Sequence, residues 1–348
     1  MKTGRSLSAL ANELERQMET KRDYIADTSA LTMLPNTKLE MRNGDMGQDL
    51  GLTDYAHGQV ASRVKIPKVY YDRMRENAPA LLADNVNHWF HKNPEKRMVR
   101  TLDDTARAFL SDRYRPIDNY DLLDAVLPRI LELGCDVQSC ELTQTRMYLK
   151  VTTPRLTADV KKGDVVQAGL VLSNSEIGAG SVRVEPLMFR LVCLNGMIIN
   201  DASLKKYHVG KLAEQMEGQV QFYRHETMAA DNKAFFMKVT DTVNGVLQQD
   251  VFDGFVRRLR ETAAEVVEAD PVTLVDNVTD RFLLKDDERS GILKHLTTGG
   301  DLTRYGLIQA VTRTSQDVDD YQRATDLETL GGSIMELPRR DWAALAAA

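Results

Sequence analysis

The sequence predicts an α+β protein in which a mostly antiparallel central sheet carries a packed helix, with helices before it and a helical region after it. Three patterns support this fold class. Apolar and polar residues alternate over 96–115, a second strand-like stretch over 135–200 has turn residues near its centre, and helical spacing dominates the last part of the chain. We therefore expect an N-terminal mainly helical region over 1–95, an α+β sheet core over 96–210 and a helical C-terminal region over 211–348.

Helical patterns dominate the first region. One amphipathic helix is expected over 5–24 and a short helix over 79–93, with a pair of helices between them over 54–76. Residues 27–53 have little periodicity and several glycines, so we expect extended chain and loops there, with one short strand at Lys38–Arg42.

The expected helix pair has two readings. Its apolar spacing places Ala61 where the two helices touch and Pro67 at the first position of the second helix, where proline's missing N–H is harmless. The outer side of that helix would carry Lys68, Asp72, Arg73 and Arg75. A DNA-reading helix-turn-helix often has glycine at the turn, where this chain has Lys65. The pair is thus either a DNA-reading unit or a purely structural one.

The core is expected to begin with two strands between 96 and 115, joined by a turn at Asp103-Asp104. Pro116 ends the second strand because it lacks an N–H donor. A helix over 119–133 follows, capped by Asp118 or Asn119, and Gly134 ends it.

A long hairpin is expected next, with Val165–Leu172 going out and Val182–Ile199 returning. Its tip, SNSEIGAG (173–180), is a candidate lid or ligand-contacting loop. The tip is not a phosphate loop, because the terminal Gly-Lys-Ser/Thr and the following helix are absent. Glu176 is the only carboxylate in it, so acid–base chemistry would need a partner from elsewhere.

Cys193 is expected inside the apolar returning strand, just before an Asn-Gly turn. A nucleophilic cysteine needs an adjacent base, and His208 is the nearest in sequence. The apolar neighbours instead favour a buried structural thiol that does not react with a mild reagent.

Basic and aromatic residues are interleaved at the end of the second core strand and in the loop after it: Arg107, Phe109, Arg113, Tyr114 and Arg115. Proteins hold single-stranded nucleic acid in this way, with positive charge on the backbone and rings under the bases. To the same predicted interface we assign Arg183, Arg190, Lys205 and Lys206. The alternative is that Phe109 is a core residue and that the arginines pair with Asp112, Asp118 and Asp121.

Composition and charge narrow the classes of protein to which the chain can belong. The net charge is −6, yet residues 96–211 hold 17 Lys and Arg against 14 Asp and Glu, so the middle is the basic part. No apolar run approaches the roughly 20 residues of a membrane helix, and the start is too polar for a secretion signal. Three cysteines without metal-ligand spacing suit the cytoplasm. His88 and His91 have no evident third ligand, so we expect no metal and no cofactor.

Four pieces of the chain resemble the phage/plasmid-like family known as domain of unknown function 932: LTDYAHGQVASRVKIPKVYYDRM, RAFLSDRYRPIDNYDLL, SNSEIGAGSVRVEPLMFRLVCLNGM and YGLIQAVTRTSQ. The resemblance covers residues from about 50 to 335. It carries over no activity, substrate or catalytic residue. It implies an association with phages, prophages and plasmids, whose accessory proteins often act on DNA. The strand–strand–helix–strand order is also similar in outline to that of phage single-strand annealing proteins, an analogy of element order only.

Two functional hypotheses follow. The first is a non-enzymatic nucleic-acid-binding protein of a mobile element, such as a single-strand annealing or protecting protein that assembles as a homo-oligomer. The second is a small-ligand enzyme or a host-interaction (anti-defence) factor, with a pocket around the 173–208 hairpin at Glu176, Arg183, Arg190 and His208. No constellation of residues names a reaction. The salt dependence of binding separates the two hypotheses. Binding to the phosphate backbone of a nucleic acid weakens steeply as salt rises, whereas binding in a small-ligand pocket would be far less sensitive.

Overall fold

The computed structural model describes residues 1–43, 46–200 and 225–347. Its secondary structure confirms the predicted α+β class with a helical C-terminal region. The chain forms two compact units. Unit 1 consists of Met1–Leu10, Asp121–Asn174 and Ser181–Ala348, and unit 2 consists of Ala11–Tyr120 and Ser175–Gly180.

The strands form two sheets, whereas the sequence predicted one central sheet. The strand pair over 96–115 does not join the strands over 135–200, because both of its edges are occupied by strands from the N-terminal region. The predicted division at residue 95 therefore differs from the observed one. The first 95 residues also hold more strands than the one predicted at Lys38–Arg42.

Unit 2 is built on a six-stranded sheet with the order β1-β5-β6-β4-β3-β2, in which only the β4–β6 pair is parallel. Its strands are β1 (Arg22–Asp27), β2 (Leu31–Met33), β3 (Leu39–Asn43), β4 (Met46–Leu52), β5 (Lys96–Leu102) and β6 (Thr105–Ser111). A short 3₁₀ helix, Thr28–Ala30, joins β1 to β2. The predicted turn between β5 and β6 is confirmed: Asp103 and Asp104 have positive φ values of 49° and 57°, as a two-residue type I′ hairpin requires.

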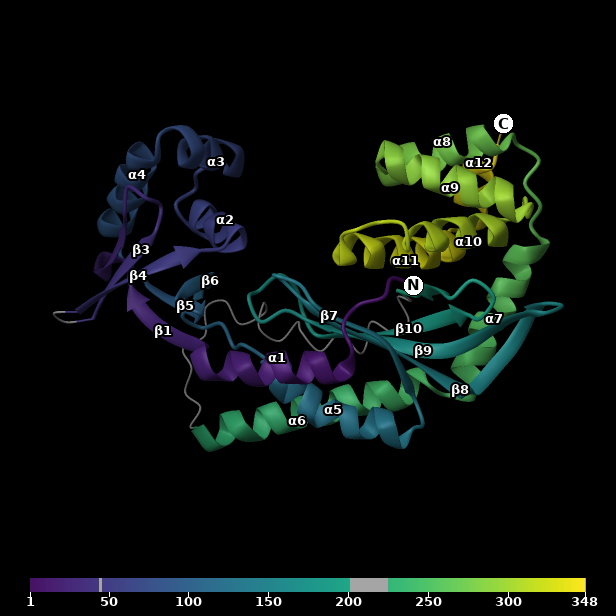
Figure 1. Cartoon of the computed structure of the whole chain (residues 1–348), viewed down its shortest axis with the longest axis horizontal. Coiled ribbons are helices and arrows are strands. Elements are labelled where there is room, and N and C mark those ends of the chain that lie inside the picture. Colours follow the sequence, from purple (N-terminus) through teal and green to yellow (C-terminus); the bar gives the residue numbers. More distant parts are fainter. Residues whose placement is uncertain (44–45, 201–224, 348) are drawn as a thin grey trace. The chain divides into compact units, whose positions relative to one another are not determined.

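Three helices gather on one side of this sheet, as Figure 1 shows: α2 (Asp54–Arg63), α3 (Lys68–Asn77) and α4 (Pro79–Lys92). Helix α2 packs on β6 and α4 on β2. The apolar core between helices and sheet includes Leu31, Val60, Leu82 and Val99, all fully buried. Helix α1 (Leu7–Thr20) confirms the predicted first helix and contains the boundary between the units.

Unit 1 is built on a five-stranded antiparallel sheet with the order β11-β10-β9-β8-β7. Its strands are β7 (Asp136–Leu142), β8 (Met147–Lys161), β9 (Asp164–Asn174), β10 (Arg183–Arg190) and β11 (Asn195–Ile198). The predicted returning strand Val182–Ile199 is therefore wrong in one respect, because Leu191–Leu194 forms a turn between β10 and β11. Asn195-Gly196, predicted as a turn, lies in β11, where Gly196 pairs with Phe189.

Helix α5 (Asn119–Glu132) confirms the predicted core helix, and Gly134 follows it with a φ of 68°. The helical C-terminal region is confirmed for the described residues by α6 (His225–Val246), α7 (Gln249–Ala264), α8 (Pro271–Phe282), α9 (Asp286–Gly299), α10 (Arg304–Thr314) and α11 (Tyr321–Glu336). A short α12 (Arg339–Leu345) was not predicted. Within unit 1, α10 and α11 lie on one side of the sheet and α5 and α6 on the other (Figure 1). Among the helices that the structure describes, none is long and apolar enough to cross a membrane.

Candidate nucleic-acid interface

The predicted basic-aromatic cluster lies in unit 2, but its first ring is buried. Phe109 is only 4% exposed and stacks on Phe90 of α4, with ring centroids 5.6 Å apart. Its side chain points to the face of β6 that the helices cover. The assignment of Phe109 to nucleic-acid binding is therefore corrected: neither face of the ring is free for a base, and Phe109 is a core residue.

Arg107 is committed to an ion pair. Its Nη1 donates to Glu176 Oε2 at 3.2 Å, and the Glu176 side chain is only 2% exposed. The same carboxylate accepts the backbone N–H of Asn119 at 2.8 Å and lies 3.4 Å from Lys21 Nζ. Glu176 therefore has several partners within unit 2.

Arg100 extends this cluster. It pairs with Asp23 and Asp118, at 2.8 and 2.7 Å, and donates to the backbone carbonyl of Glu176 at 2.9 Å. Lys21 also reaches Asp118. Burial works against the charge of Asp118, but Arg100 and Lys21 outweigh it and hold its pKa below the usual value. We call this set the Glu176 network: Lys21, Asp23, Arg100, Arg107, Asp118, Asn119 and Glu176.

The Glu176 network is balanced, with three basic and three acidic side chains. It fixes the 175–180 loop to the β5–β6 strands of unit 2, and the glycine at Gly178 (φ 81°) lets the loop pass close to Leu110. A carboxylate so enclosed cannot reach a substrate without breaking these contacts. These contacts hold the loop in place, and the predicted pocket around Glu176 stays a prediction. His208, the other group of the predicted pocket, lies outside the described residues.

The other predicted loop residues differ in exposure. Tyr114 is half-buried and its hydroxyl donates to the Ser175 carbonyl at 3.4 Å, and burial raises the pKa of Tyr114. Arg115 is half-buried as well, whereas Arg113 is exposed. Of the five clustered residues, Arg113 alone presents an exposed side chain in the described structure.

The remaining predicted residues belong to unit 1. Arg190 makes a two-point contact with Asp164, at 2.6 and 2.9 Å. Arg183 is 39% exposed and its Nη1 lies 3.9 Å from Glu185. Lys205 and Lys206 lie outside the described residues. The structure therefore does not gather the predicted residues into one surface of one unit.

Helices α2 and α3 are joined by a short turn over 64–67. Helix α2 begins after Thr53, whose side chain accepts the Ala56 N–H at 3.2 Å. Between the helices Lys65 takes a left-handed conformation, with a φ of 57°, at the position where helix-turn-helix units often carry glycine. The Ile66 N–H then bonds to the Ala61 carbonyl at 2.9 Å, and Ala61 is 1% exposed, as predicted for the contact between the helices.

Side-chain bonds lock the two helices together. His57 Nδ1 and the Tyr71 hydroxyl are 2.9 Å apart, and both side chains are buried. Arg75 of α3 reaches back to Asp54 at 2.7 Å. Burial lowers the pKa of His57 to about 4, so the imidazole is neutral at physiological pH. The pair is therefore a rigid unit.

Helix α3 presents an unusual outer face. Tyr71 and Met74 point inward, which leaves Val69 85% exposed and Tyr70 49% exposed. The basic residues Lys65, Lys68 and Arg73 are exposed around them. Val69, Tyr70 and Lys65 were not among the predicted site residues. Helical spacing places Val69 opposite the inward side of α3, where Tyr71 and Met74 lie, so the signal for Val69 was present in the sequence, whereas Tyr70 lies beside Met74 and Lys65 precedes the helix.

Metal chemistry has no support in the residues that the structure describes, where no group of three or more His, Cys, Asp or Glu residues converges. His88 and His91 thus stay without a third ligand there.

Comparison with known proteins gives one match. The family described as Domain of unknown function (DUF932) matches residues 108–330, which is more than half of the chain. No curated protein and no solved structure matches.

Proposed function

The chain belongs to the DUF932 family, and because that family's description assigns no function, we propose from the geometry of α2 and α3 that this protein binds duplex DNA through α3. One observation carries the proposal: α3 follows α2 after a left-handed turn at Lys65, and its outer face is uncovered within unit 2. In helix-turn-helix proteins the second helix lies in the major groove, and residues near its N-terminus contact the base edges.

The charges of this face suit the phosphate backbone. Within the described part of the chain, neither Lys65 nor Arg73 forms an ion pair, so both are available to phosphates. Lys68 is paired with Asp72, which reduces its contribution. The first N–H groups of α3 also lack a side-chain cap, because Pro67 occupies the N-cap position. Free N–H groups at a helix N-terminus bind phosphate well.

The apolar residues of this face suit the bases. Val69 lies in the first turn of α3 and is almost entirely exposed. In the major groove, thymine presents a methyl group that apolar side chains contact. Val69 and Tyr70 are therefore the residues that we assign to base contact.

Single-strand annealing stays a prediction, because nothing in the described structure tests it. Phe109 is a core residue and Arg107 is paired with Glu176, so part of the sequence argument for single-strand binding no longer holds. A role in the cytoplasm as a mobile-element protein also stays a proposal, and duplex binding would be consistent with it.

Fluorescence anisotropy with labelled duplexes of random sequence tests the proposal. We expect duplex binding that weakens as salt rises. Arg73→Ala and Lys65→Ala should each flatten the salt dependence by about one charge. Val69→Asp should weaken binding more than either, since it adds a negative charge at the groove.

Lys162→Ala is the matched control, because Lys162 is an exposed lysine in the β8–β9 turn of unit 1. It should bind as the wild type does. Absence of duplex binding at low salt would refute the proposal, as would unchanged binding by Val69→Asp. A preference for single strands that Tyr114→Ala abolishes would favour the original cluster instead.

A further inference from the structure

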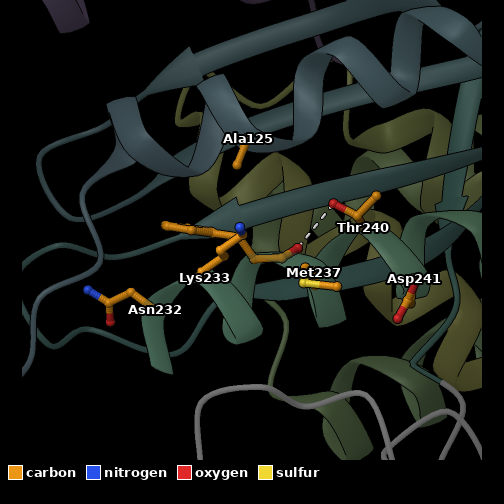
Figure 2. Close-up of a pocket in the computed structure, with 7 residues that line it drawn as sticks. Ala125, Asn232, Lys233, Met237, Thr240 and Asp241 are labelled. Carbon is orange, nitrogen blue, oxygen red and sulfur yellow. Dashed lines mark hydrogen bonds between the residues drawn. The ribbon is translucent and has the colours of Figure 1, made fainter. Parts of the chain in front are cut away.

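Helix α6 has an exposed methionine, Met237, beside an open groove in unit 1. Val239 and Val243 point into the core and are fully buried, whereas Met237 on the outer side is 60% exposed. The groove has a volume of about 660 Å³ and runs between α6 and Ala125 of α5 (Figure 2). Phe236 and Met237 give it a largely apolar lining. An exposed methionine beside an apolar groove favours a protein partner.

Two residues of opposite charge flank Met237, so the surface around it is self-complementary. Lys233 and Asp241 both line the groove, four residues before and four residues after Met237. Residues four apart lie on one side of a helix, about 6 Å apart along its axis. Neither Lys233 nor Asp241 forms an ion pair in the part of the chain that the structure describes.

We propose that α6 pairs with α6 of a second copy, antiparallel about a twofold axis that passes through Met237. This arrangement places Lys233 of each copy opposite Asp241 of the other, which forms the same ion pair twice. The two Met237 side chains then lie against each other at the axis, between the apolar grooves of the two copies. A parallel pairing would set like charges against each other, so the sequence of charges selects the antiparallel one.

The occupant is a second copy because one helix supplies both halves of the contact. An unrelated partner would need no symmetric placement of opposite charges around a central apolar residue. A single pair of helices buries less surface than a standard protein interface, so we expect a weak dimer with a Kd on the order of 10 µM. The inference is independent of DNA binding, since the dimer is measured without DNA and α3 belongs to unit 2.

Sedimentation velocity over a range of concentrations of the full chain tests the proposal. The wild type should shift from monomer to dimer as concentration rises. Lys233→Glu sets a glutamate against Asp241 at both ends of the pair, and Asp241→Lys sets a lysine against Lys233. Each variant alone should weaken the dimer by at least about tenfold.

Mixing the two variants is the decisive step. Lys233→Glu paired with Asp241→Lys restores opposite charges at both ends, so the mixture should dimerise at concentrations at which each variant is monomeric. Lys162→Glu, a charge reversal at an exposed site in the β8–β9 turn, should dimerise as the wild type does. A wild type that stays monomeric at about 100 µM, ten times the expected Kd, overturns the proposal. So does a dimer that survives both charge reversals, or a mixture that stays monomeric.

Discussion

Replacement of Glu176 by glutamine tests the Glu176 network most directly. The change keeps the shape of the side chain and an acceptor for the Asn119 N–H, but removes the negative charge 3.2 Å from Arg107. At that distance, in an effective dielectric of about 20, the attraction between unit charges is about 5 kcal/mol. Desolvation offsets part of it, and breaking a buried pair typically costs about 3–5 kcal/mol. Since Lys21 still has Asp118 as a partner, we expect the free energy of unfolding to fall by an amount near the lower end of that range.

A double-mutant cycle with Arg107→Met isolates the pair. The double variant should lose about 1–3 kcal/mol less unfolding free energy than the two single variants lose in sum, because neither charge is then left buried without its partner. Glu40→Gln is the control within unit 2: it removes an ion pair with Arg42 at a similar distance, 3.1 Å, but with the Arg42 side chain 66% exposed. Loss of that pair should change stability by less than about 1 kcal/mol.

The two tryptophans make the assay specific for each unit, because Trp89 lies in unit 2 and Trp342 in unit 1. In a Trp342→Phe background, urea unfolding followed by fluorescence reports on unit 2 alone. A loss below about 1 kcal/mol for Glu176→Gln, or fully additive single losses, would refute the reasoning. Arg107→Met should also leave DNA affinity per folded molecule unchanged, in contrast to the role first predicted for it.

Three further outcomes are expected. As the pH falls from roughly 6.5 to 4, unit 2 should lose up to about 1.4 kcal/mol of its free energy of unfolding per pH unit. The unfolded chain protonates His57 at its usual pKa, whereas burial lowers the pKa of His57 in the folded state to about 4. In urea titrations, His57→Gln should show a shallower dependence of stability on pH. Gly178→Ala should destabilise more than Gly163→Ala: both glycines have positive φ, but an added Cβ at Gly178 would lie 2.8 Å from Leu110, whereas Gly163 has open space, and equal melting temperatures would contradict this. Cys193 should react with a mild thiol reagent before Cys140, since Cys193 is half-buried in a turn and burial raises the pKa of Cys140 to about 11; mass spectrometry of labelled peptides would reveal the opposite order.

The expectation for Cys193 reverses the prediction from sequence, and the reason is local. The residues Leu191 to Leu194 are apolar, and an apolar run reads as a buried strand. In the structure they form the exposed turn between β10 and β11, with Val192 60% exposed and Leu194 at a φ of 53°. Turn formation here depends on the pairing of Gly196 with Phe189, which no single-strand pattern reveals.

Local patterns were sufficient for the helices and for several turns. The apolar spacing of α5, the Asp103-Asp104 turn and the contact of Ala61 between α2 and α3 all follow from interactions between residues close in sequence. The same is true of the outer face of α3, because a helix places every third or fourth residue on one side. The sequence by itself thus determined the class of fold and the helix pair on which the proposed function rests.

Only the tertiary structure decided which side chains of the basic-aromatic cluster are buried or paired and which are exposed. Strict alternation along β6 would place Arg107 and Phe109 on one face, but the register of the β5–β6 pair shifts at Arg107, so that Phe109 shares the core beneath the helices with Ala106. Phe109 is covered by Phe90, 19 positions earlier in the sequence. Arg107 is neutralised by Glu176, 69 positions later. Partners so distant in sequence meet only when the chain folds, so the sequence could propose charged and aromatic residues but could not tell which of them would remain free to bind.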